Sequence, residues 1–495
     1  MKQSFLLLTL LILCRTSVSA QVFEEFRRQQ QESFNAFKQQ TADDFAAYRK
    51  RINNEFTEFL KTNWEIKDVN EPKPEPPKEP DIPIVVLPDV DIEIPEDKKI
   101  DVNIDLAVRP QEKKEEEPQP IAPVTYTPRP QEKRISFSFY GTEGIIRFDV
   151  SKKASLKGSK ENDVSRFWNE LSSDNYDNLL ADCLNQKKEL DLCDWAYFKM
   201  TEIVSETIYG KTNDAVVFQV WLLAQSGFDA RIGRENDNLH LLLHANEMIF
   251  NKPYWRLNDG MYFLLDGHKA EKMNIMGKSF PNTKAVRMSV AAQNKFLSKD
   301  TEPRLLRSKR YPDAAAQVVC NRNLLDFLND YPASAVEDSQ DTDWSKYAYT
   351  PLSETSKDKL YPVLSQQIEG KNEADAANIL LNFVQTAFEY KTDNEVWGTE
   401  RPFFPEETLF YPYCDCEDRA ILFCRLVADL MGLKTALVYY PGHLASAVQF
   451  ITDIKGDYFI IDGKRYLICD PTYINAPIGQ TMPRKDNSTA KVFPL

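Results

Sequence analysis

The stretch Tyr411-Pro-Tyr-Cys-Asp-Cys-Glu-Asp-Arg-Ala-Ile-Leu-Phe-Cys-Arg-Leu-Val-Ala-Asp-Leu-Met-Gly432 decides how the C-terminal half of the chain is organised. Its apolar residues recur at helical spacing, which predicts an amphipathic helix from Glu417 to about Met431. Carboxylates crowd the start of this helix, where they suit free backbone N–H groups, and a glycine ends it. Cys416 therefore lies at a helix N-terminus, one of the few positions that favour a thiolate over a thiol.

Two residues downstream can assist this cysteine: His443, in Pro-Gly-His-Leu, and Asp470, in Cys-Asp-Pro-Thr. A cysteine nucleophile needs a nearby base, and that base needs a third group to fix its tautomer. Each residue has a commoner structural role when it is considered alone. Lone cysteines usually pack in cores, as we expect of Cys424 and Cys469. Asp462 is a rival acid, but it precedes a glycine, a pair typical of a hairpin turn. The order Cys, His, Asp favours a catalytic set.

These motifs together resemble the transglutaminase-like superfamily, as a bacterial exported member. The resemblance rests on Asp-Cys-Glu-Asp-Arg-Ala at the helix start, a glycine at its end, the Pro-Gly-His strand and the closing Asp-Pro-Thr, within residues 375–475. It implies an α+β, papain-like fold with a Cys-His-Asp triad. Carried over, Cys416 is the nucleophile, His443 the general base and acid, and Asp470 the orienting carboxylate.

The sequence departs from the family pattern at two places. The interval between His443 and Asp470 is longer than in many members, which leaves room for an extra hairpin around Ile454–Gly463. Cys414 precedes the nucleophile where a glycine is more usual, so it is either a redox partner or a packing residue. An upstream tryptophan often assists the oxyanion in this family, and Trp397 is the candidate here.

Three carboxylates beside Cys416 oppose its ionisation, because like charges disfavour a thiolate. Either they point outward as helix caps, or a cation neutralises them. Bacterial transglutaminase-like cysteine proteinases resemble the chain at Asp415-Cys-Glu417 and can bind calcium there, so calcium is a candidate ligand. No HExxH or paired CxxC metal motif is present, and no cofactor is required by the predicted chemistry.

The second half of the chain looks like a repeat of the first. Residues 214–227 align without a gap with residues 419–432, and His240 and Asp266 match His443 and Asp470. In the first copy the position of the nucleophile falls on Lys211. We therefore predict a degenerate transglutaminase-like domain over 134–285, a connecting strand and loop region over 286–349, and a catalytic domain over 350–495. Chance similarity of two helix–strand–strand patterns is the alternative.

The N-terminal part predicts export and a separate helix. Residues 1–20 have the basic start, apolar run and small-residue cleavage site of a signal peptide, so we expect a periplasmic or extracellular protein. Nothing else is long and apolar enough to cross a membrane. Aromatic pairs recur every eleven residues in 21–66, which predicts an amphipathic helix for self-association or partner docking, as in a right-handed coiled coil, or for packing on the chain's own domain. Residues 67–133 form a Pro-rich, acidic linker whose segments Val90–Ile94 and Ile100–Leu106 could join a sheet edge.

Composition narrows the function further. The formal net charge of -14 disfavours nucleic acid as a partner. Seven cysteines follow the predicted signal peptide, an odd number, and Cys183 could pair with Cys193. The leading hypothesis is an exported cysteine hydrolase, a peptidase or amidase, that acts on a protein or peptide through a thioester at Cys416. The alternatives are a protein-crosslinking transglutaminase and a non-catalytic scaffold or partner-binding protein.

Overall fold

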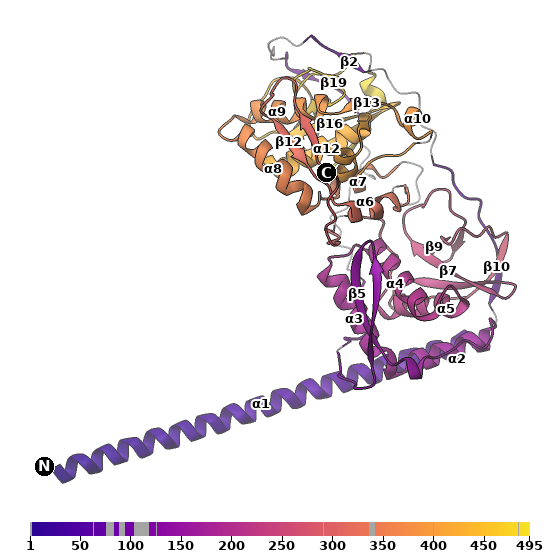
Figure 1. Cartoon of the computed structure of the whole chain (residues 1–495), viewed down its shortest axis with the longest axis vertical. Helices are drawn as coiled ribbons and strands as arrows, with labels where there is room; N and C mark the ends of the chain where they lie inside the picture. Colours follow the sequence, from indigo (N-terminus) through magenta and orange to yellow (C-terminus); the bar gives the residue numbers. More distant parts are fainter. Residues whose placement is uncertain are drawn as a thin grey trace.

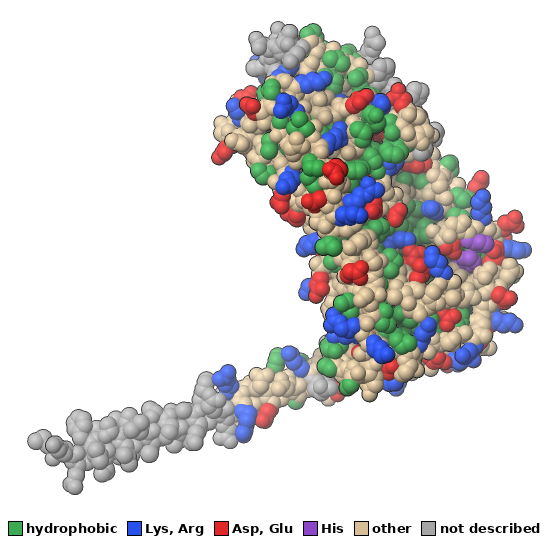
Figure 2. Space-filling model, viewed as in Figure 1, with side chains coloured by type: hydrophobic (Ala, Val, Ile, Leu, Met, Phe, Trp, Pro, Cys, Tyr) green, Lys and Arg blue, Asp and Glu red, His purple; other side chains and the backbone are tan. Residues whose placement is uncertain are grey.

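The computed structural model describes residues 2–62, 64–75, 84–88, 95–102, 118–124, 126–290, 292–335, 342–398, 400–483 and 485–495, and the side chains within them except those of 2–26, 39 and 174. A long helix, α1, extends from a body in which two regions, each built on a sheet, lie one above the other (Figure 1). On the face shown in Figure 2, basic and acidic side chains are interspersed and form no single basic patch. Among the described helices, none has the length and apolar character needed to cross a membrane.

Helix α1 spans Lys2–Leu60, so it begins earlier than the predicted range of 21–66 and ends before residue 66. Its last turns pack on the chain itself: Phe56 is buried against Trp168 and Phe280, with ring centroids 4.9 and 5.0 Å away. The aromatic side chains nearer the N-terminus, Phe34 and Phe37, are exposed. The row of aromatic side chains along α1 therefore has a buried C-terminal part and an exposed part nearer the N-terminus. Of the alternatives for this helix, packing on the chain's own domain holds for its C-terminal part.

The region after α1 contains a hairpin, four helices and a six-stranded sheet. The hairpin is β4 (Lys133–Phe139) and β5 (Thr142–Phe148). The helices are α2 (Glu161–Leu171), α3 (Asp177–Glu189), α4 (Asp194–Tyr209) and α5 (Asn213–Gln225), with short 3-10 turns at Val150–Lys152 and Asp174–Tyr176. The sheet has the order β1-β10-β6-β7-β9-β8. Its strands are β1 (Glu65–Asp68), β6 (Ala230–Glu235), β7 (Asn238–Ala245), β8 (Tyr254–Leu257), β9 (Gly260–Leu264) and β10 (Lys272–Ile275).

The connecting region is more helical than predicted. It holds the hairpin β11 (Arg304–Arg307) and β12 (Ala315–Val318), followed by α6 (Arg322–Asn329) and α7 (Trp344–Tyr349). The prediction of strand and loop for 286–349 is therefore wrong for these two helices. Both are short and begin at side-chain caps, since Asn321 accepts a hydrogen bond from the backbone N–H of Asn323 and Asp343 one from that of Lys346.

The C-terminal region has five helices and a second six-stranded sheet. The helices are α8 (Glu354–Ile368), α9 (Glu373–Thr386), α10 (Asp393–Val396), α11 (Pro405–Phe410) and α12 (Cys416–Met431), with a 3-10 turn at Asn487–Thr489. The sheet has the order β20-β15-β16-β18-β17-β3. Its strands are β3 (Lys98–Lys99), β15 (Lys434–Tyr440), β16 (His443–Gln449), β17 (Asp457–Ile461), β18 (Lys464–Cys469) and β20 (Lys491–Pro494). The pairs β13 (Glu389–Tyr390)–β14 (Tyr413–Cys414) and β2 (Val85–Val86)–β19 (Tyr473–Ile474) lie outside it.

The two sheets share one connectivity. Strands β10-β6-β7-β9-β8 of the first correspond in spatial and chain order to β20-β15-β16-β18-β17 of the second. In both, a buried helix, α5 or α12, precedes the first of these strands. The extra hairpin predicted around Ile454–Gly463 is found as β17–β18, and Asp462 and Gly463 form its turn with positive φ angles of 48° and 74°. This common order is what a duplicated domain requires.

The linker contributes strands to both sheets. Strand β1 joins the first sheet, and β3 lies on the edge of the second, beside β17. The backbone N–H of Ile100 continues this pairing by donating to the carbonyl of Tyr458 at 2.8 Å, and the Ile100 side chain is buried. The described parts of 67–133 are therefore more than a spacer. The segment Val90–Ile94 lies outside the described residues.

Candidate active site

Helix α12 places Cys416 at its first turn. Asp415 is the N-cap, and its backbone N–H donates to Oδ2 of Asp418 at 3.1 Å, while Oδ1 of the same carboxylate accepts from the backbone N–H of Phe403 at 2.8 Å. Gly432 closes the helix with a φ of 66°, a left-handed conformation that costs glycine little. The predicted helix is thus confirmed, and both of its ends are fixed by the residues that the sequence indicated.

The structure brings the three predicted site residues together. His443 is the first residue of β16, and its Nε2 lies 2.9 Å from Oδ2 of Asp470, which directly follows β18. The backbone N–H of the next residue, Leu444, lies 3.5 Å from Sγ of Cys416. Because Nε2 is engaged by the carboxylate, Nδ1 is the ring nitrogen left for a second partner. The side chains of Cys416, His443 and Asp470 are nearly closed to solvent, at 1%, 2% and 2% residue exposure.

Asp470 is held as a carboxylate. Burial pushes its pKa upward, but the charge of the His443 imidazolium and hydrogen bonds from that ring and from the backbone N–H of Thr472 outweigh burial, so the pKa is lowered below its usual value. Gln385 of α9 fixes the segment that follows. Its Nε2 donates to the backbone carbonyls of Asp470, Tyr473 and Ala476 at 3.3, 2.8 and 3.0 Å.

Lys485 is a neighbour of this site that sequence reasoning missed. Burial lowers the pKa of its ammonium group to about 8, against the opposing effect of the negative charges of Asp470 and Cys416. Lys485 lies well after the Asp-Pro-Thr motif, in a segment without regular secondary structure, so no periodic pattern in the sequence pointed to it. A cation here favours the ionised forms of both site residues.

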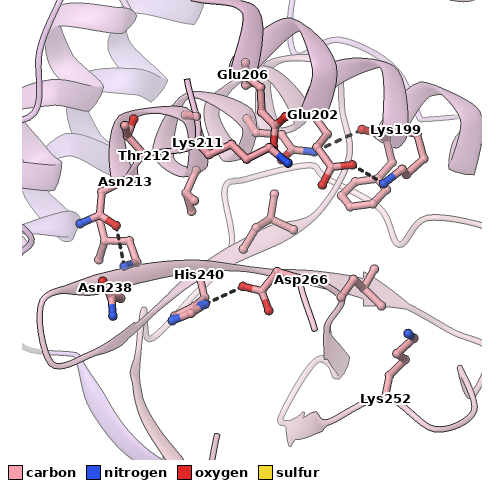
Figure 3. A pocket seen from close by; sticks show the side chains of 18 of the residues that line it. Lys199, Glu202, Glu206, Lys211, Thr212, Asn213, Asn238, His240, Lys252 and Asp266 are labelled. Carbon is pink, nitrogen blue, oxygen red and sulfur yellow. Dashed lines mark hydrogen bonds and ion pairs between the residues drawn. The ribbon is translucent and has the colours of Figure 1, made fainter. Parts of the chain in front are cut away.

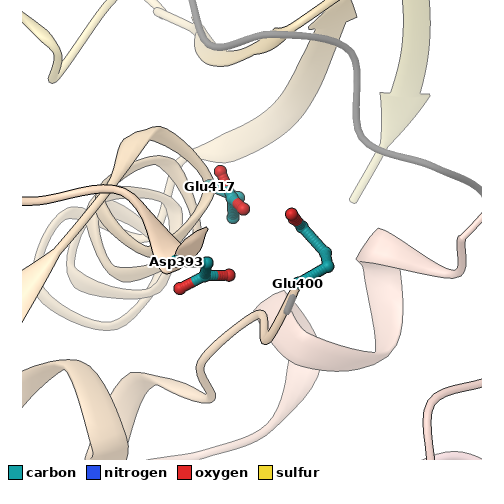
Figure 4. A group of neighbouring side chains, drawn as sticks. All are labelled: Asp393, Glu400 and Glu417. Atoms are coloured by element: carbon teal, nitrogen blue, oxygen red, sulfur yellow. The ribbon is translucent and has the colours of Figure 1, made fainter. Parts of the chain in front are cut away.

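The carboxylates beside Cys416 are buried, which excludes the alternative that they point outward, although Asp415 and Asp418 do cap the helix. Oε2 of Glu417 lies 3.0 Å from Sγ of Cys416. Two further carboxylates from the segment before α12 converge on Glu417: Asp393, at the start of α10, and Glu400 (Figure 4). Oxygen atoms within 4.8 Å of one another are offered by Asp393, Glu400 and Glu417, and by Asp393 with Asp415 and Asp418.

This cluster carries an electrostatic cost. The pKa of Asp418 is raised well above its usual value, first by burial and then by the charges of Asp415, Asp393 and Glu417. An all-oxygen, carboxylate-rich donor set is the kind that Ca²⁺ prefers. The residues present therefore fit the predicted cation. Their backbone partners fix them further, since the N–H of Arg401 donates to Oδ2 of Asp393 at 2.6 Å.

The remaining predicted residues have structural contacts. All seven cysteines from Cys183 onward are buried, and none forms a disulfide among the described residues, so Cys183 and Cys193 do not pair. Cys414 packs beside the buried Arg419, whose Nε lies 3.4 Å from its Sγ. The ring of Trp397 lies edge-on to Tyr411, with centroids 5.3 Å apart, and under the guanidinium of Arg401.

Comparison with known proteins supports the superfamily. Residues 359–493 match a family model described as a transglutaminase-like domain. This C-terminal part of the chain, which contains Cys416, His443 and Asp470, therefore belongs to the transglutaminase-like superfamily, as the motifs predicted. Searches among curated proteins and among solved structures gave no match.

Proposed function

We propose that the chain is an exported cysteine hydrolase, a peptidase or amidase, that acts through a thioester at Cys416. The Sγ thiolate attacks the carbonyl carbon of an amide, and the imidazolium of His443 gives its proton to the departing amine. His443 then takes a proton from water, which attacks the thioester. The carboxylic acid product leaves, which regenerates the thiolate of Cys416 and the imidazolium of His443.

The observation that carries this proposal is the meeting of three elements at one point. The start of β16 contacts Sγ of Cys416, at the start of α12, through the backbone N–H of Leu444, and the carboxylate that follows β18 orients the imidazole of His443. Each comes from a different part of the chain, so their convergence needs the whole domain. Asp470 remains ionised and stabilises the imidazolium formed when the thiol loses its proton.

A short pulse of iodoacetamide near neutral pH, read by mass spectrometry, tests the assembled site. The other thiols are internal controls, because burial raises the pKa of Cys414 to about 11 and those of Cys193 and Cys424 to about 12. We expect rapid labelling of Cys416 that is lost in His443→Ala. His244→Ala, which removes another buried histidine, should leave it intact. Equal labelling of all thiols, or labelling unaffected by His443→Ala, would contradict the proposal.

Two alternatives remain testable. In a crosslinking transglutaminase an amine takes the place of water, so incubation of a glutamine peptide with a primary amine would yield the amine adduct in place of the hydrolysed product. The near-complete burial of the triad favours a non-catalytic scaffold, because a closed site admits no substrate. Slow, unselective labelling of Cys416 in the test above would support the scaffold.

Calcium is proposed as the cation of the carboxylate cluster. Asp393, Glu400 and Glu417 would hold it, with Asp415 and Asp418 beside them. A bound cation would neutralise the negative charge next to Cys416 and so favour its thiolate. The chain's own contribution is to hold these carboxylates in place through α12 and the backbone of the preceding loop.

The exposed part of α1 is proposed as a docking surface. Phe34 and Phe37 are 51% and 69% exposed and belong to the eleven-residue repeat. Large aromatic side chains in an exposed row favour association with a second copy or with a partner. We also propose that residues 1–20 direct export to the periplasm or the extracellular medium. The two sheets are proposed to have arisen by duplication of one domain.

A further inference from the structure

A cavity of about 860 Å³ lies in the first region, between α4, the start of α5 and strands β7 and β9. Lys199, Glu202 and Glu206 line it from α4, and His240 and Asp266 line it from the sheet side (Figure 3). It occupies the place that corresponds to Cys416 and His443 in the second region, next to a helix start and the first residues of the matching strand. Its volume is in the range of ligand-binding pockets.

The cavity is open because the loop before the helix is short. Only residues 210–212 separate α4 from α5, whereas residues 387–415 separate α9 from α12 and carry the carboxylates that crowd Cys416. The first residue of α5 is Asn213, and its Oδ1 accepts from the backbone N–H of Leu239 at 3.0 Å. Asn213 is thus the counterpart of Cys416 at the helix start, while Lys211, which the sequence alignment put there, lies two residues earlier. An amide is no nucleophile, so the cavity can bind but not acylate.

His240 provides the built polar group of this cavity. It is 7% exposed, its Nδ1 lies 2.6 Å from Oδ2 of Asp266, and its Nε2 is buried without a hydrogen-bond partner among the described residues. Its ring stacks on His268, with centroids 4.6 Å apart, and Nε2 of His268 lies 2.6 Å from Glu235. A neutral imidazole that donates its Nδ1–H to a carboxylate keeps Nε2 as an acceptor. Because a buried polar atom without a partner is costly, a ligand N–H would relieve this cost.

The charges of the lining favour a ligand with groups of both signs. Lys199 pairs with Glu202, and Nζ of Lys211 lies 3.8 Å from Glu206, so these four largely cancel. Lys252 also lines the cavity and has no hydrogen bond or ion pair within the described part of the chain. A polyanion such as a nucleotide would face the carboxylates as well as this one unpaired cation.

Apolar side chains complete the wall of the cavity. Trp195, Phe198 and Leu265 offer surface for apolar groups beside the polar floor. A peptide combines everything that the lining can satisfy: backbone N–H groups for Nε2 of His240, a carboxylate for Lys252, and side chains for the apolar wall. We propose that this cavity binds a short peptide segment without cleaving it. The proposal does not rest on the chemistry assigned to Cys416.

Imidazole NMR tests this directly, because the chain contains only four histidines. In full-length protein with ¹⁵N-labelled histidine and the Cys416→Ala change, we would add an equimolar mixture of synthetic tetrapeptides with free termini. Their second residue would be leucine, phenylalanine, lysine or glutamate. We expect the Nε2 resonance of His240, assigned by its absence in His240→Gln, to shift. His244, which pairs with Asp229 in the same sheet but does not line the cavity, is the matched control and should stay unchanged.

The surface variant Lys252→Ala should weaken peptide binding about tenfold or more, because it removes a charged partner of the ligand. A His240 resonance that is unmoved by the peptides would overturn the proposal, as would a shift that is identical in Lys252→Ala. A shift confined to His443 would place peptide at the C-terminal site alone and would also overturn it. Failure of Cys416 to label with iodoacetamide would refute the hydrolase but leave the His240 result intact, so the two failures are distinguishable.

Discussion

Removing one charge from the carboxylate cluster should stabilise the cation-free protein and abolish its response to calcium. Asp393 belongs to both groups of converging carboxylates, with oxygens within 4.8 Å of one another. At an effective dielectric constant of 20, two unit charges at that distance repel by about 3.5 kcal/mol. Three ionised carboxylates then carry roughly 10 kcal/mol of repulsion, as much as the whole stability of a typical domain. Protons or a cation must therefore compensate it.

The assay is thermal unfolding of wild type and Asp393→Asn in EDTA and in calcium. At a hundredfold excess over its Kd, calcium should stabilise the wild type by about 2.7 kcal/mol, or roughly 5–10 °C in Tm. Asp393→Asn should unfold at a higher temperature than wild type in EDTA and show no calcium shift. The asparagine can still accept the hydrogen bond from the backbone of Arg401. Asp453→Asn, which changes a side chain 93% exposed, controls for general ionic effects.

The pH dependence gives an independent check. Burial and neighbouring carboxylates raise the pKa of Asp418, so the folded state binds more protons than the unfolded state between the usual and the raised pKa. Without calcium, stability should therefore fall as pH rises through this window. Calcium should remove that fall because it replaces the protons. Equal Tm values in EDTA and calcium at every pH, together with an Asp393→Asn variant no more stable than wild type in EDTA, would refute the reasoning.

Three further predictions concern other parts of the chain. Asp470→Asn should slow turnover and the alkylation of Cys416 by about 10²–10⁴-fold, measured by single-turnover kinetics and labelling rates, while urea unfolding checks that the fold survives. Phe56→Ala should cost about 3–5 kcal/mol of stability in urea unfolding, because the ring of Phe56 is buried. The side chain of Phe37 is exposed, so Phe37→Ala should cost less than about 0.5 kcal/mol but should reduce self-association, measured by sedimentation. Burial lowers the pKa of Lys346 to about 8, so between about pH 8 and 10.5 the unfolded state binds more protons than the folded state. Urea unfolding should therefore show a free energy of unfolding that rises with pH over this range. The Lys346→Met variant should lack this rise.

The sequence predicted the elements that have strong periodicity or end signals. Helix α12 has an apolar stripe, a carboxylate-rich start and a terminal glycine, and its bounds were nearly correct. Helix α5 was indicated by the match of its residues to those of α12. The short helices α6 and α7 were missed because so few residues show little periodicity, although their asparagine and aspartate caps were a usable signal.

What could not be predicted depends on contacts between distant segments. Strand β3 joins the second sheet through backbone pairing with β17, which needs no side-chain pattern. Asp393 begins the short helix α10 and Glu400 lies in the loop after it, so only the fold reveals that they meet Glu417. The same holds for the two halves of α1: its repeat is uniform in sequence, but only the C-terminal turns reach the surface formed by α2.

The His–Asp pair by itself does not distinguish a catalytic site from a binding site. In both sheets a histidine near the start of a central strand bonds a carboxylate at the end of its neighbour, and such a bond also ties two strands together. The difference lies at the facing helix start, where one region has a thiol among buried carboxylates and the other has Asn213 beside an open cavity. The residue at the helix start therefore decides whether chemistry is available, and the length of the preceding loop decides whether the place is open. Since these two features vary independently, labelling of Cys416 and peptide binding at His240 are separate questions, and neither answer fixes the other.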